Sequence, residues 1–436
     1  MALLLLGVLV LRAGGFEGIS HDDAARSLLA VDFRASPRLD ATRSSWLPAH
    51  TWLLGAALTI LRPSRLWWVS LAGGLAACAS LVALSRRRGL TGWALVISVA
   101  LPLCWPWTVV ASAAPGVPEL PCVALVLGAL VALERTTLAG DLTAGLLLTV
   151  ACGHRYEAWW ATAGVLAVLA HGRAWRRLGR VGIVALAIPA LWLLMNHQRA
   201  GDALDFLHRV RAFREAEGAL EPLWRRALRF PTLLGREAPW AYFGAAVTLA
   251  TTRRLRPETA AALAVLAGLV SGELQGSGPT HHPERALLLP VWLLGPAAGV
   301  ALGRLGGARG PLLALALAAC WGAYPLRRAR FTSVAPEAPA AGREVRRLLG
   351  GDRSRCWFVE AAWEEFLWVE HASEASRRAV PDRDYGGPAP SEDTALARLP
   401  ACATVAAVTS ERLRVALRGR QFRERWSHGG WTVLAR

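Results

Sequence analysis

The sequence predicts an all-α polytopic membrane protein with a small C-terminal α/β domain, and three observations support this fold class. Hydrophobic residues make up 54% of the 436 positions and charged residues only 19%, and a soluble domain of that composition would expose too much apolar surface. The apolar residues fall in blocks of about 15 to 22, the length that crosses a bilayer as a helix. These blocks end near residue 325, and the remaining chain has the pattern of a small soluble domain.

The apolar blocks predict about eleven transmembrane helices. Residues 1–13 lack the basic segment and cleavage site of a signal peptide, so we expect them to remain as the first span. Residues 47–61 are too short and interrupted for a span, and we expect them to lie in the membrane interface or to join the next helix at a bend. The predicted spans are 1–14, 64–84, 90–110, 119–133, 138–152, 158–171, 181–197, 238–252, 258–273, 286–302 and 311–325.

Arginine placement predicts the orientation of these helices, because short basic connections stay in the cytoplasm. With a cytoplasmic N-terminus, the inner connections are all short and basic: 86–88, 135, 171–180, 253–256 and 303–310. Acidic and histidine residues concentrate on the other side, in 15–46, 111–118, 153–157, 198–237, 274–285 and the tail from about 326. We therefore expect a multi-pass protein of the inner (plasma) membrane with an extracytoplasmic C-terminal domain.

The net charge of +17 does not indicate nucleic-acid binding. All 49 basic residues are arginine, a bias typical of GC-rich bacterial genomes, and many lie at helix ends, where they orient the spans. The seven cysteines show no metal-ligand spacing. Cys356 and Cys402 either form a disulfide or stay free thiols, whereas five others lie in apolar blocks and are expected to pack there: Cys78, Cys104, Cys122, Cys152 and Cys320.

The tail, 326–436, is predicted to be an α/β domain and carries no catalytic motif. Apolar runs at 355–360 and 402–409 predict buried strands. Ser410 is the predicted N-cap of a helix over 410–420. His428-Gly429-Gly430 between two strand-like segments predicts a hairpin, and 382–393 predicts a loop.

An acidic pair, Asp22 and Asp23, follows the first span in the first outer loop. Neighbouring carboxylates there can act as a general base, position an acceptor, or hold a divalent cation such as Mg²⁺ or Mn²⁺. The structural alternative is that Ser20, Asp22 or Asp23 caps the helix that begins there. Taken alone, the pair favours the capping role.

Further polar clusters lie at the outer ends of other predicted helices. Ionisable groups near the hydrocarbon are costly, so such clusters tend to mark a substrate path or site. Each cluster alone could be an interfacial anchor or an ion pair, but together they favour one shared cavity that faces outward. Their ionisable members are Glu119, then His154, Arg155 and Glu157, then His281, His282, Glu284 and Arg285.

An activated sugar on a polyprenyl phosphate suits such a cavity. No ATP is present outside the cytoplasm, and the sequence carries no Walker or kinase motif. Arginine binds phosphate through two parallel hydrogen bonds, and a carboxylate can deprotonate an acceptor hydroxyl. The bilayer and the apolar helices can hold the isoprenoid chain.

Five segments resemble, in order and sidedness, motifs of the GT-C superfamily of membrane glycosyltransferases. They are SHDDAARSLLA (20–30), SSWLPAHTWLLG (44–55), SAAPGVPELP (112–121), HRYEAWW (154–160) and HPERALLLP (282–290). The chain is most similar to the bacterial dolichyl-phosphate-mannose-protein-mannosyltransferase-like and lipid A aminoarabinose transferase-like branches. The resemblance covers about residues 1–325 and implies inverting transfer of a sugar from a polyprenyl-phosphate donor to a glycan, lipid or protein acceptor.

The resemblance also implies roles for the cluster residues. Asp22 would be the base, supported by Asp23, and Glu119 would orient the acceptor or a metal. Arg155 and Arg285 would bind the lipid-linked phosphate, each held by a neighbouring acid, Glu157 or Glu284. Four histidines could bind phosphate, sugar hydroxyls or a metal: His50, His154, His281 and His282.

Three positions depart from the family pattern. Asp23 replaces a frequent Glu, Ala158 replaces a Gly, and Ala286 replaces a Tyr. These departures could shift substrate choice or signal lost activity. The loop 198–237 predicts an amphipathic helix that serves as a lid of the cavity or simply covers the bundle.

Other functions remain open at this point. A lipid-linked polysaccharide ligase or polymerase shares the donor class but usually has its largest outer loop late in the chain. A transporter is expected to have ionisable residues in the middle of its spans and two similar halves in its sequence. The acidic residues here lie at the ends of the spans. A non-catalytic membrane scaffold is the third alternative.

Overall fold

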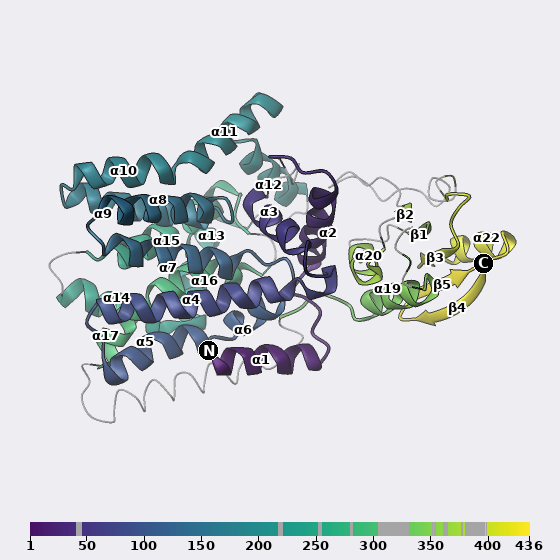
Figure 1. Ribbon diagram of the computed structural model, residues 1–436, viewed down its shortest axis with the longest axis horizontal. Coiled ribbons are helices and arrows are strands. Elements are labelled where there is room, and N and C mark those ends of the chain that lie inside the picture. The colour runs from purple at the N-terminus through teal and green to yellow at the C-terminus, as the bar shows by residue number, and fades with distance from the viewer. Residues whose placement is uncertain are drawn as a thin grey trace.

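The computed structural model describes residues 1–40, 46–216, 221–251, 255–279, 282–303, 331–350, 352, 355–360, 365–375, 378–379, 397 and 399–436. A largely helical part up to residue 303 is followed by a C-terminal part built on a small sheet (Figure 1), which confirms the predicted fold class in this respect. The predicted span 311–325, the predicted loop 382–393 and Cys320 lie outside the described residues.

Seven helices of the first part coincide with predicted apolar blocks, because each block has few charged residues and supplies good helix formers. Figure 1 shows many of them running side by side along the molecule. They are α1 (Ala2–Ala13), α4 (Trp67–Arg87), α7 (Glu119–Leu133), α8 (Leu138–Cys152), α9 (Glu157–His171), α14 (Pro239–Thr251) and α15 (Pro257–Gln275).

Three other predicted blocks are each divided by a bend. Helices α5 (Gly92–Cys104) and α6 (Pro106–Ala113) meet at 58°, where Pro106 cannot continue the hydrogen-bond ladder of α5. Helices α10 (Trp175–Ala185) and α11 (Ala187–Ala200) meet at 44°. The third bend, 55°, separates η2 (Pro283–Leu287) and α16 (Leu288–Leu293) from α17 (Gly295–Gly303).

By length and composition, two of the described helical stretches can cross a membrane, Pro63–Arg87 and Pro257–Gln275. Counting each bent pair as one span raises this number to five. The apolar helices α1, α7 and α8 are shorter than a full span. The described residues therefore do not establish the predicted eleven crossings.

The outer loops fold into helices of their own. The first loop forms α2 (His21–Ala35), and the short block after it forms α3 (Pro48–Ala57), which packs on α2 before η1 (Pro63–Arg65) leads into α4. Figure 1 shows α2 and α3 at the end of the bundle that faces the C-terminal part. The loop 198–237 contains two helices rather than the one predicted, α12 (Asp205–Ala216) and α13 (Leu223–Glu237).

Small residues allow close contacts between the long helices. A Cβ built on Gly164 of α9 would lie 2.7 Å from the carbonyl oxygen of Ala260 in α15. A Cβ on Gly73 of α4 would lie 2.7 Å from the ring of Pro121 in α7. Helices packed in a membrane commonly use such residues, because van der Waals contact replaces the hydrophobic effect as the driving force there.

Ion pairs join one end of these helices. Arg88, just after α4, donates two hydrogen bonds to Glu258 at the start of α15 (2.9 and 2.8 Å) and lies 2.8 Å from Glu134, just after α7. Arg177 of α10 bonds Asp141 of α8 at 2.8 Å. Both arginines belong to predicted cytoplasmic connections, so basic loops gather at this end of the bundle.

The C-terminal part is a five-stranded sheet of order β2-β1-β3-β5-β4 with helices beside it. Parallel pairing joins β1 to β2 and β3, and antiparallel pairing joins β3 to β5 and β5 to β4, with a bulge in β4 between Glu424 and Trp426. The elements are α19 (Glu337–Leu348), β1 (Trp357–Val359), α20 (Phe366–Ser373), β2 (Arg378–Ala379), β3 (Val405–Val408), α22 (Glu411–Gly419), β4 (Arg423–His428) and β5 (Trp431–Ala435).

Local signals in the tail sequence explain several of these elements. Ser410 accepts a hydrogen bond from the amide of Leu413 and caps α22, as predicted. Gly429 and Gly430 have φ of 56° and 86°, the left-handed conformation that a two-residue hairpin turn needs at both positions. The predicted helix and hairpin are thus confirmed, whereas α19, α20 and the two-residue β2 were not predicted.

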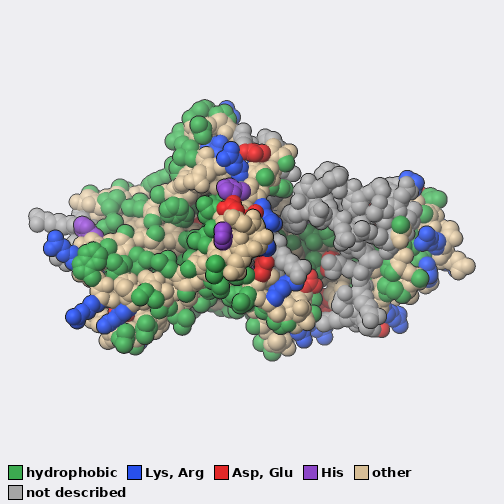
Figure 2. Space-filling model, turned by 90° about the horizontal axis from the view of Figure 1, so that it is seen from above, with side chains coloured by type: hydrophobic (Ala, Val, Ile, Leu, Met, Phe, Trp, Pro, Cys, Tyr) green, Lys and Arg blue, Asp and Glu red, His purple; other side chains and the backbone are tan. Residues whose placement is uncertain are grey.

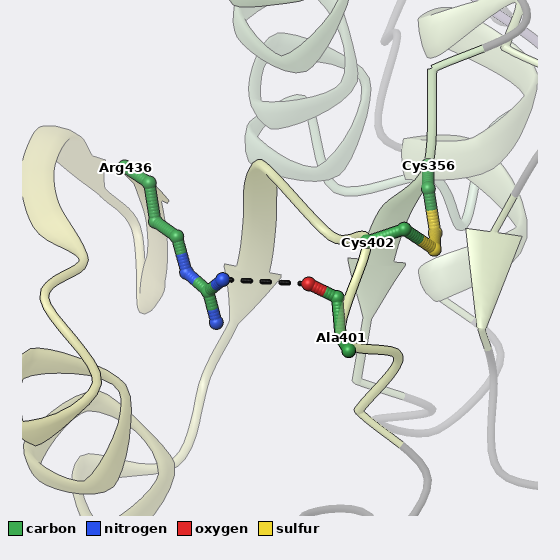
Figure 3. Close-up of a disulfide and its surroundings, with 4 residues drawn as sticks. All are labelled: Cys356, Ala401, Cys402 and Arg436. Atoms are coloured by element: carbon green, nitrogen blue, oxygen red, sulfur yellow. Dashed lines mark hydrogen bonds between the residues drawn. A yellow bond between two sulfur atoms is a disulfide. The ribbon is translucent and has the colours of Figure 1, made fainter.

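Cys356 and Cys402 form a disulfide that links the segments leading into β1 and β3 (Figure 3). Beside it, the Arg436 guanidinium donates a hydrogen bond to the carbonyl of Ala401 at 3.4 Å. Of the cysteines expected to pack in apolar blocks, Cys78, Cys122 and Cys152 are buried, but Cys104 is exposed. Cys104 is the last residue of α5 and lies between the buried Leu103 and Trp105, so its side chain points away from the face that packs.

We predict that replacing Gly164 with Ala lowers the stability of the helical part by about 1–3 kcal/mol, because the new methyl group overpacks a contact made by backbone atoms. Thermal unfolding in detergent measures the effect. Gly179→Ala is the matched control, since a Cβ at Gly179 of α10 meets no atom within 4 Å and alanine favours helix by about 1 kcal/mol over glycine. Equal melting temperatures for the two variants would contradict the close α9–α15 contact.

Candidate functional site

A cavity of about 270 Å³ lies where the first outer helices meet the ends of α7, α9 and α15. Figure 2 shows acidic, basic and histidine side chains gathered near the middle of the molecule, whereas hydrophobic side chains cover much of the helical part. Of the residues predicted from the sequence, eight line the cavity: Asp22, His50, Glu119, His154, Arg155, Glu157, His282 and Arg285. Segments up to 263 positions apart in the sequence thus contribute to one hollow.

The two aspartates of the acidic pair have different surroundings. Asp23 is fully buried, and its Oδ2 accepts hydrogen bonds from the amides of Ile19 (2.7 Å) and Ser20 (3.3 Å). This is the helix-capping role that the sequence left open, and it fixes the start of α2. Asp22 lies on the cavity wall with its side chain 29% exposed, 3.8 Å from Arg26. Of the two, Asp22 is therefore the carboxylate that a substrate can reach.

Burial dominates the ionisation of Asp23, which lies outside the membrane-spanning helices. Removal from water raises the pKa of Asp23 to about 6, although Arg285 and Arg26 favour its charged form. Its Oδ1 lies 3.6 Å from Arg285 and 4.0 Å from Arg26. Asp23 therefore connects the start of α2 to two guanidinium groups.

Glu119, the first residue of α7, lies between two arginines. Its Oε1 accepts hydrogen bonds from Arg155 at 3.0 Å and from Arg285 at 2.9 Å. Its Oε2 is buried and has no hydrogen-bond partner among the described residues. A buried carboxylate oxygen without a partner is uncommon, and Glu119 lines the cavity, so this atom retains an unused capacity to accept a hydrogen bond.

Carboxylates hold both arginines, although one of them is not the predicted one. Arg155 bonds to Glu157 two residues later, with Nε 3.0 Å from Oε2. Arg285 is held by Glu119 and Asp23. Glu284 was expected to hold Arg285, but its Oε1 lies 3.5 Å from Arg236 of α13, because adjacent side chains in the tight η2 turn point in different directions.

The histidines line part of the cavity. His50 of α3 and His154 lie edge to face, with ring centroids 5.5 Å apart. His154 bonds the carbonyl of Val150 through Nδ1 at 2.9 Å, and its Nε2 has no partner in the described part of the chain. Burial lowers the pKa of His154, in the turn between α8 and α9, to about 4, so the ring is neutral near pH 7. His282 packs on Trp107, and His281 lies outside the described residues.

The carboxylates proposed as metal ligands do not fit a divalent cation. The guanidinium of Arg285 stands between Asp23 and Glu119, and that of Arg26 lies within 4.0 Å of both aspartates. A second cation there would be repelled by these fixed charges. The described residues contain no group of three or more His, Cys, Asp or Glu side chains that could hold a metal ion. Among the roles that the sequence left open for Asp22, Asp23 and Glu119, the surrounding arginines therefore favour base and acceptor contacts over a metal site.

Several wall residues were not predicted. Arg26 follows Asp22 and Asp23 by four and three residues, a spacing that places all three on one helix face, and its guanidinium lies over the ring of Trp46 at 4.5 Å. The spacing of Arg26 from the acidic pair could have identified this residue as a site candidate from the sequence. Leu207 and Val210 of α12 also line the cavity, so the amphipathic helix predicted in 198–237 forms part of its wall.

We predict that Asp23→Asn flattens the pH dependence of stability between about pH 4 and 6. Because the folded-state pKa of Asp23 is raised to about 6, the native state binds this proton more tightly than the unfolded chain. Ionising Asp23 as the pH rises through this window therefore destabilises the wild type, by up to roughly 3 kcal/mol. Asparagine stays uncharged, so the variant lacks this loss.

Thermal unfolding in detergent at pH 4.5, 5.5 and 7 measures this effect. Asp32→Asn is the control, since Asp32 is an exposed residue of the same helix. An unchanged slope in Asp23→Asn would show that Asp23 is ionised throughout the range.

Comparisons with known proteins show the fold. No protein-family model matches the sequence, and no curated protein is significantly similar to it. The crystal structure of ArnT from Cupriavidus metallidurans bound to undecaprenyl phosphate aligns with 100% of this chain and 97% of its own, at 14% identity and a TM-score of 0.64. The apo form of that protein aligns with 100% of this chain and 98% of its own, with 14% identity and a TM-score of 0.62.

A second solved protein supports the same conclusion. The archaeal oligosaccharyltransferase AglB from Archaeoglobus fulgidus, in complex with an inhibitory peptide and a dolichol-phosphate, aligns with 90% of this chain and 66% of its own. The identity is 14% and the TM-score 0.51. The chain thus has the fold of ArnT and AglB, both members of the GT-C superfamily, and the predicted resemblance is confirmed at the level of the fold.

Proposed function

We propose that the protein is an integral membrane glycosyltransferase that transfers a sugar from a polyprenyl-phosphate donor to an extracytoplasmic acceptor. The observation that carries this proposal is the convergence of Asp22, Glu119, Arg155 and Arg285 in one cavity on a fold shared with ArnT and AglB. Those two solved structures contain undecaprenyl phosphate and a dolichol-phosphate, which supports a lipid-phosphate ligand for this cavity as well.

The arginines supply the binding site for the donor phosphate. Arg155 and Arg285 flank Glu119 and line the cavity. A phosphate that enters exchanges some of these carboxylate contacts for charge-assisted hydrogen bonds of its own. Glu157 keeps Arg155 oriented during this exchange, so the guanidinium is already in place when the phosphate arrives.

The lipid chain needs an apolar path, and apolar residues of the cavity lining can provide it. Trp160, Leu207, Val210 and Leu269 are among the lining residues, and the Trp160 side chain is partly exposed. An isoprenoid can pass between these residues to the bilayer while its phosphate remains at the arginines. The expected partners are therefore the lipid bilayer and a polyprenyl-phosphate-linked sugar.

Asp22 is the proposed general base. Its partly exposed carboxylate takes the proton of the acceptor hydroxyl, and the acceptor oxygen attacks the anomeric carbon from the face opposite the phosphate. The bond between the anomeric carbon and the phosphate oxygen breaks with its electron pair on that oxygen. Arg155 and Arg285 stabilise this charge. The products are an inverted glycoside and the polyprenyl phosphate.

The orientation of the chain in the membrane follows from the same proposal. The cavity lies at the end of the bundle that carries the acidic and histidine residues, whereas the basic connections lie at the other end. The Cys356–Cys402 disulfide supports an extracytoplasmic C-terminal part, because disulfides persist mainly outside the reducing cytosol. The N-terminus is then cytoplasmic, and the acceptor is a glycan, lipid or protein of the cell envelope.

We predict that Asp22→Asn lowers transfer about 10²–10⁴-fold, the usual contribution of a general base, while binding of undecaprenyl phosphate is retained. The assay follows label from a panel of short-chain prenyl-phosphate sugars into envelope extracts with the protein in proteoliposomes. Asp32→Asn, on the exposed face of the same helix, serves as the control. Full activity of Asp22→Asn would remove Asp22 from the mechanism.

We predict that Arg155→Gln weakens the binding of undecaprenyl phosphate about 10- to 100-fold, since hydrogen bonds to charged groups contribute about 1.5–3 kcal/mol each. Ligand-induced shifts of the melting temperature measure this affinity. Arg211→Gln is the matched control, because Arg211 forms a local ion pair with Glu215 on the exposed face of α12 and does not line the cavity. Equal affinities for the two variants would argue against the arginine phosphate site.

A further inference from the structure

The C-terminal part rests on the short segment 17–23 that leads into α2 and carries the acidic pair. Trp368 of α20 packs on Gly18 so closely that a Cβ on this glycine would lie 2.5 Å from Cη2 of the indole. Ala24 of α2 belongs to the same buried cluster as Trp368 and the core of the C-terminal part. Figure 1 shows α20 next to the end of the bundle that carries α2.

Polar contacts accompany this packing. The amide of Ser333, in the segment before α19, donates to the carbonyl of Ile19 at 2.9 Å. Arg343 of α19 lies 2.7 Å from Glu17. The C-terminal part thus contacts the backbone or side chains of Glu17, Gly18 and Ile19, three consecutive residues.

The helical part holds the opposite side of the same segment. Gly116, in the turn before α7, approaches it so closely that a Cβ would lie 2.5 Å from the carbonyl oxygen of Asp23. The Arg285 guanidinium lies 3.5 Å from the Ser20 hydroxyl. The backbone that carries Asp22 is therefore fixed from two directions, and only one of them belongs to the cavity wall.

The indole of Trp368 contributes shape to this contact. Its side chain is 1% exposed, and its Nε1 has no hydrogen-bond partner among the described residues. A buried indole N–H without a partner costs free energy. The ring therefore stabilises this contact through its packing against Gly18 and not through a hydrogen bond. None of the described residues of the C-terminal part lines the cavity.

We propose that the C-terminal part sets the position of Asp22 in the cavity, with Trp368 on Gly18 as the positioning contact. This inference rests on the proposed function, because it assigns the contact a role in transfer. A base misplaced by about 1 Å can lower turnover roughly 100-fold without loss of substrate binding. The C-terminal part therefore acts on the rate although it touches no reacting atom.

The test uses a pair of complementary substitutions in the full chain. Gly18→Ala introduces a methyl group 2.5 and 2.6 Å from Cη2 and Cζ2 of the indole and 3.3 Å from Oδ2 of Asp23. Trp368→Phe removes the two indole atoms, which are the closest neighbours, and leaves the Asp23 contact unchanged. We expect Gly18→Ala to lower kcat about 10- to 100-fold with KM for the donor changed less than about threefold, and the double variant to recover most of kcat. Trp426→Phe, on β4 of the same domain, should retain wild-type kcat.

Hydrogen–deuterium exchange of residues 17–23 gives a second readout that needs no activity. Gly18→Ala should speed exchange at the amides of Ile19 and Ser20, and the double variant should restore protection. Unchanged exchange or unchanged kcat in Gly18→Ala, or a double variant as slow as the single one, overturns the positioning role. Wild-type protein that transfers no sugar overturns the proposed function instead, and exchange alone then decides whether the C-terminal part holds this segment.

Discussion

A chain of alternating charges organises the cavity end of the molecule. Asp23, Arg285, Glu119, Arg155 and Glu157 follow one another at ion-pair distances, and they come from α2, η2, α7, the turn before α9 and the start of α9. These charges are buried or half-buried, and each needs a partner, because an unpaired ion away from water costs several kcal/mol. Each element must therefore dock in register with the others, and the same groups that hold the helices together create the polar lining of the cavity.

Helix positions and the grouping of polar residues could be predicted from the sequence because both are local signals. Apolar blocks gave the helices to within a few residues, and residues such as Glu119 and Arg155 stand out at block ends. The partners within the group depend on side-chain direction in three dimensions. Glu284 therefore pairs with Arg236 rather than Arg285, and the difference between the buried Asp23 and the accessible Asp22 emerges only when α2 is packed.

Helix bends and long-range tertiary contacts are the other features that the sequence could not predict. Pro106 lies within an apolar block that a periodicity argument treats as one span, yet the chain turns by 58° there. Arg26 had a recognisable spacing from the acidic pair, but the contact between Gly18 and Trp368 joins positions 350 residues apart. The sequence identity to ArnT and AglB is only 14%, so chains can share this fold while they differ at most positions.

The edge strand β4 of the C-terminal sheet affects how neighbouring copies of the protein can associate. Proteins confined to a bilayer meet one another at high local concentration, and an open strand edge invites a second chain to pair with it. In β4, Arg423, Glu424 and Arg425 are exposed, and the bulge after Glu424 interrupts the flat ladder that such pairing requires. Charge and irregularity together keep adjoining molecules from fusing into a continuous sheet.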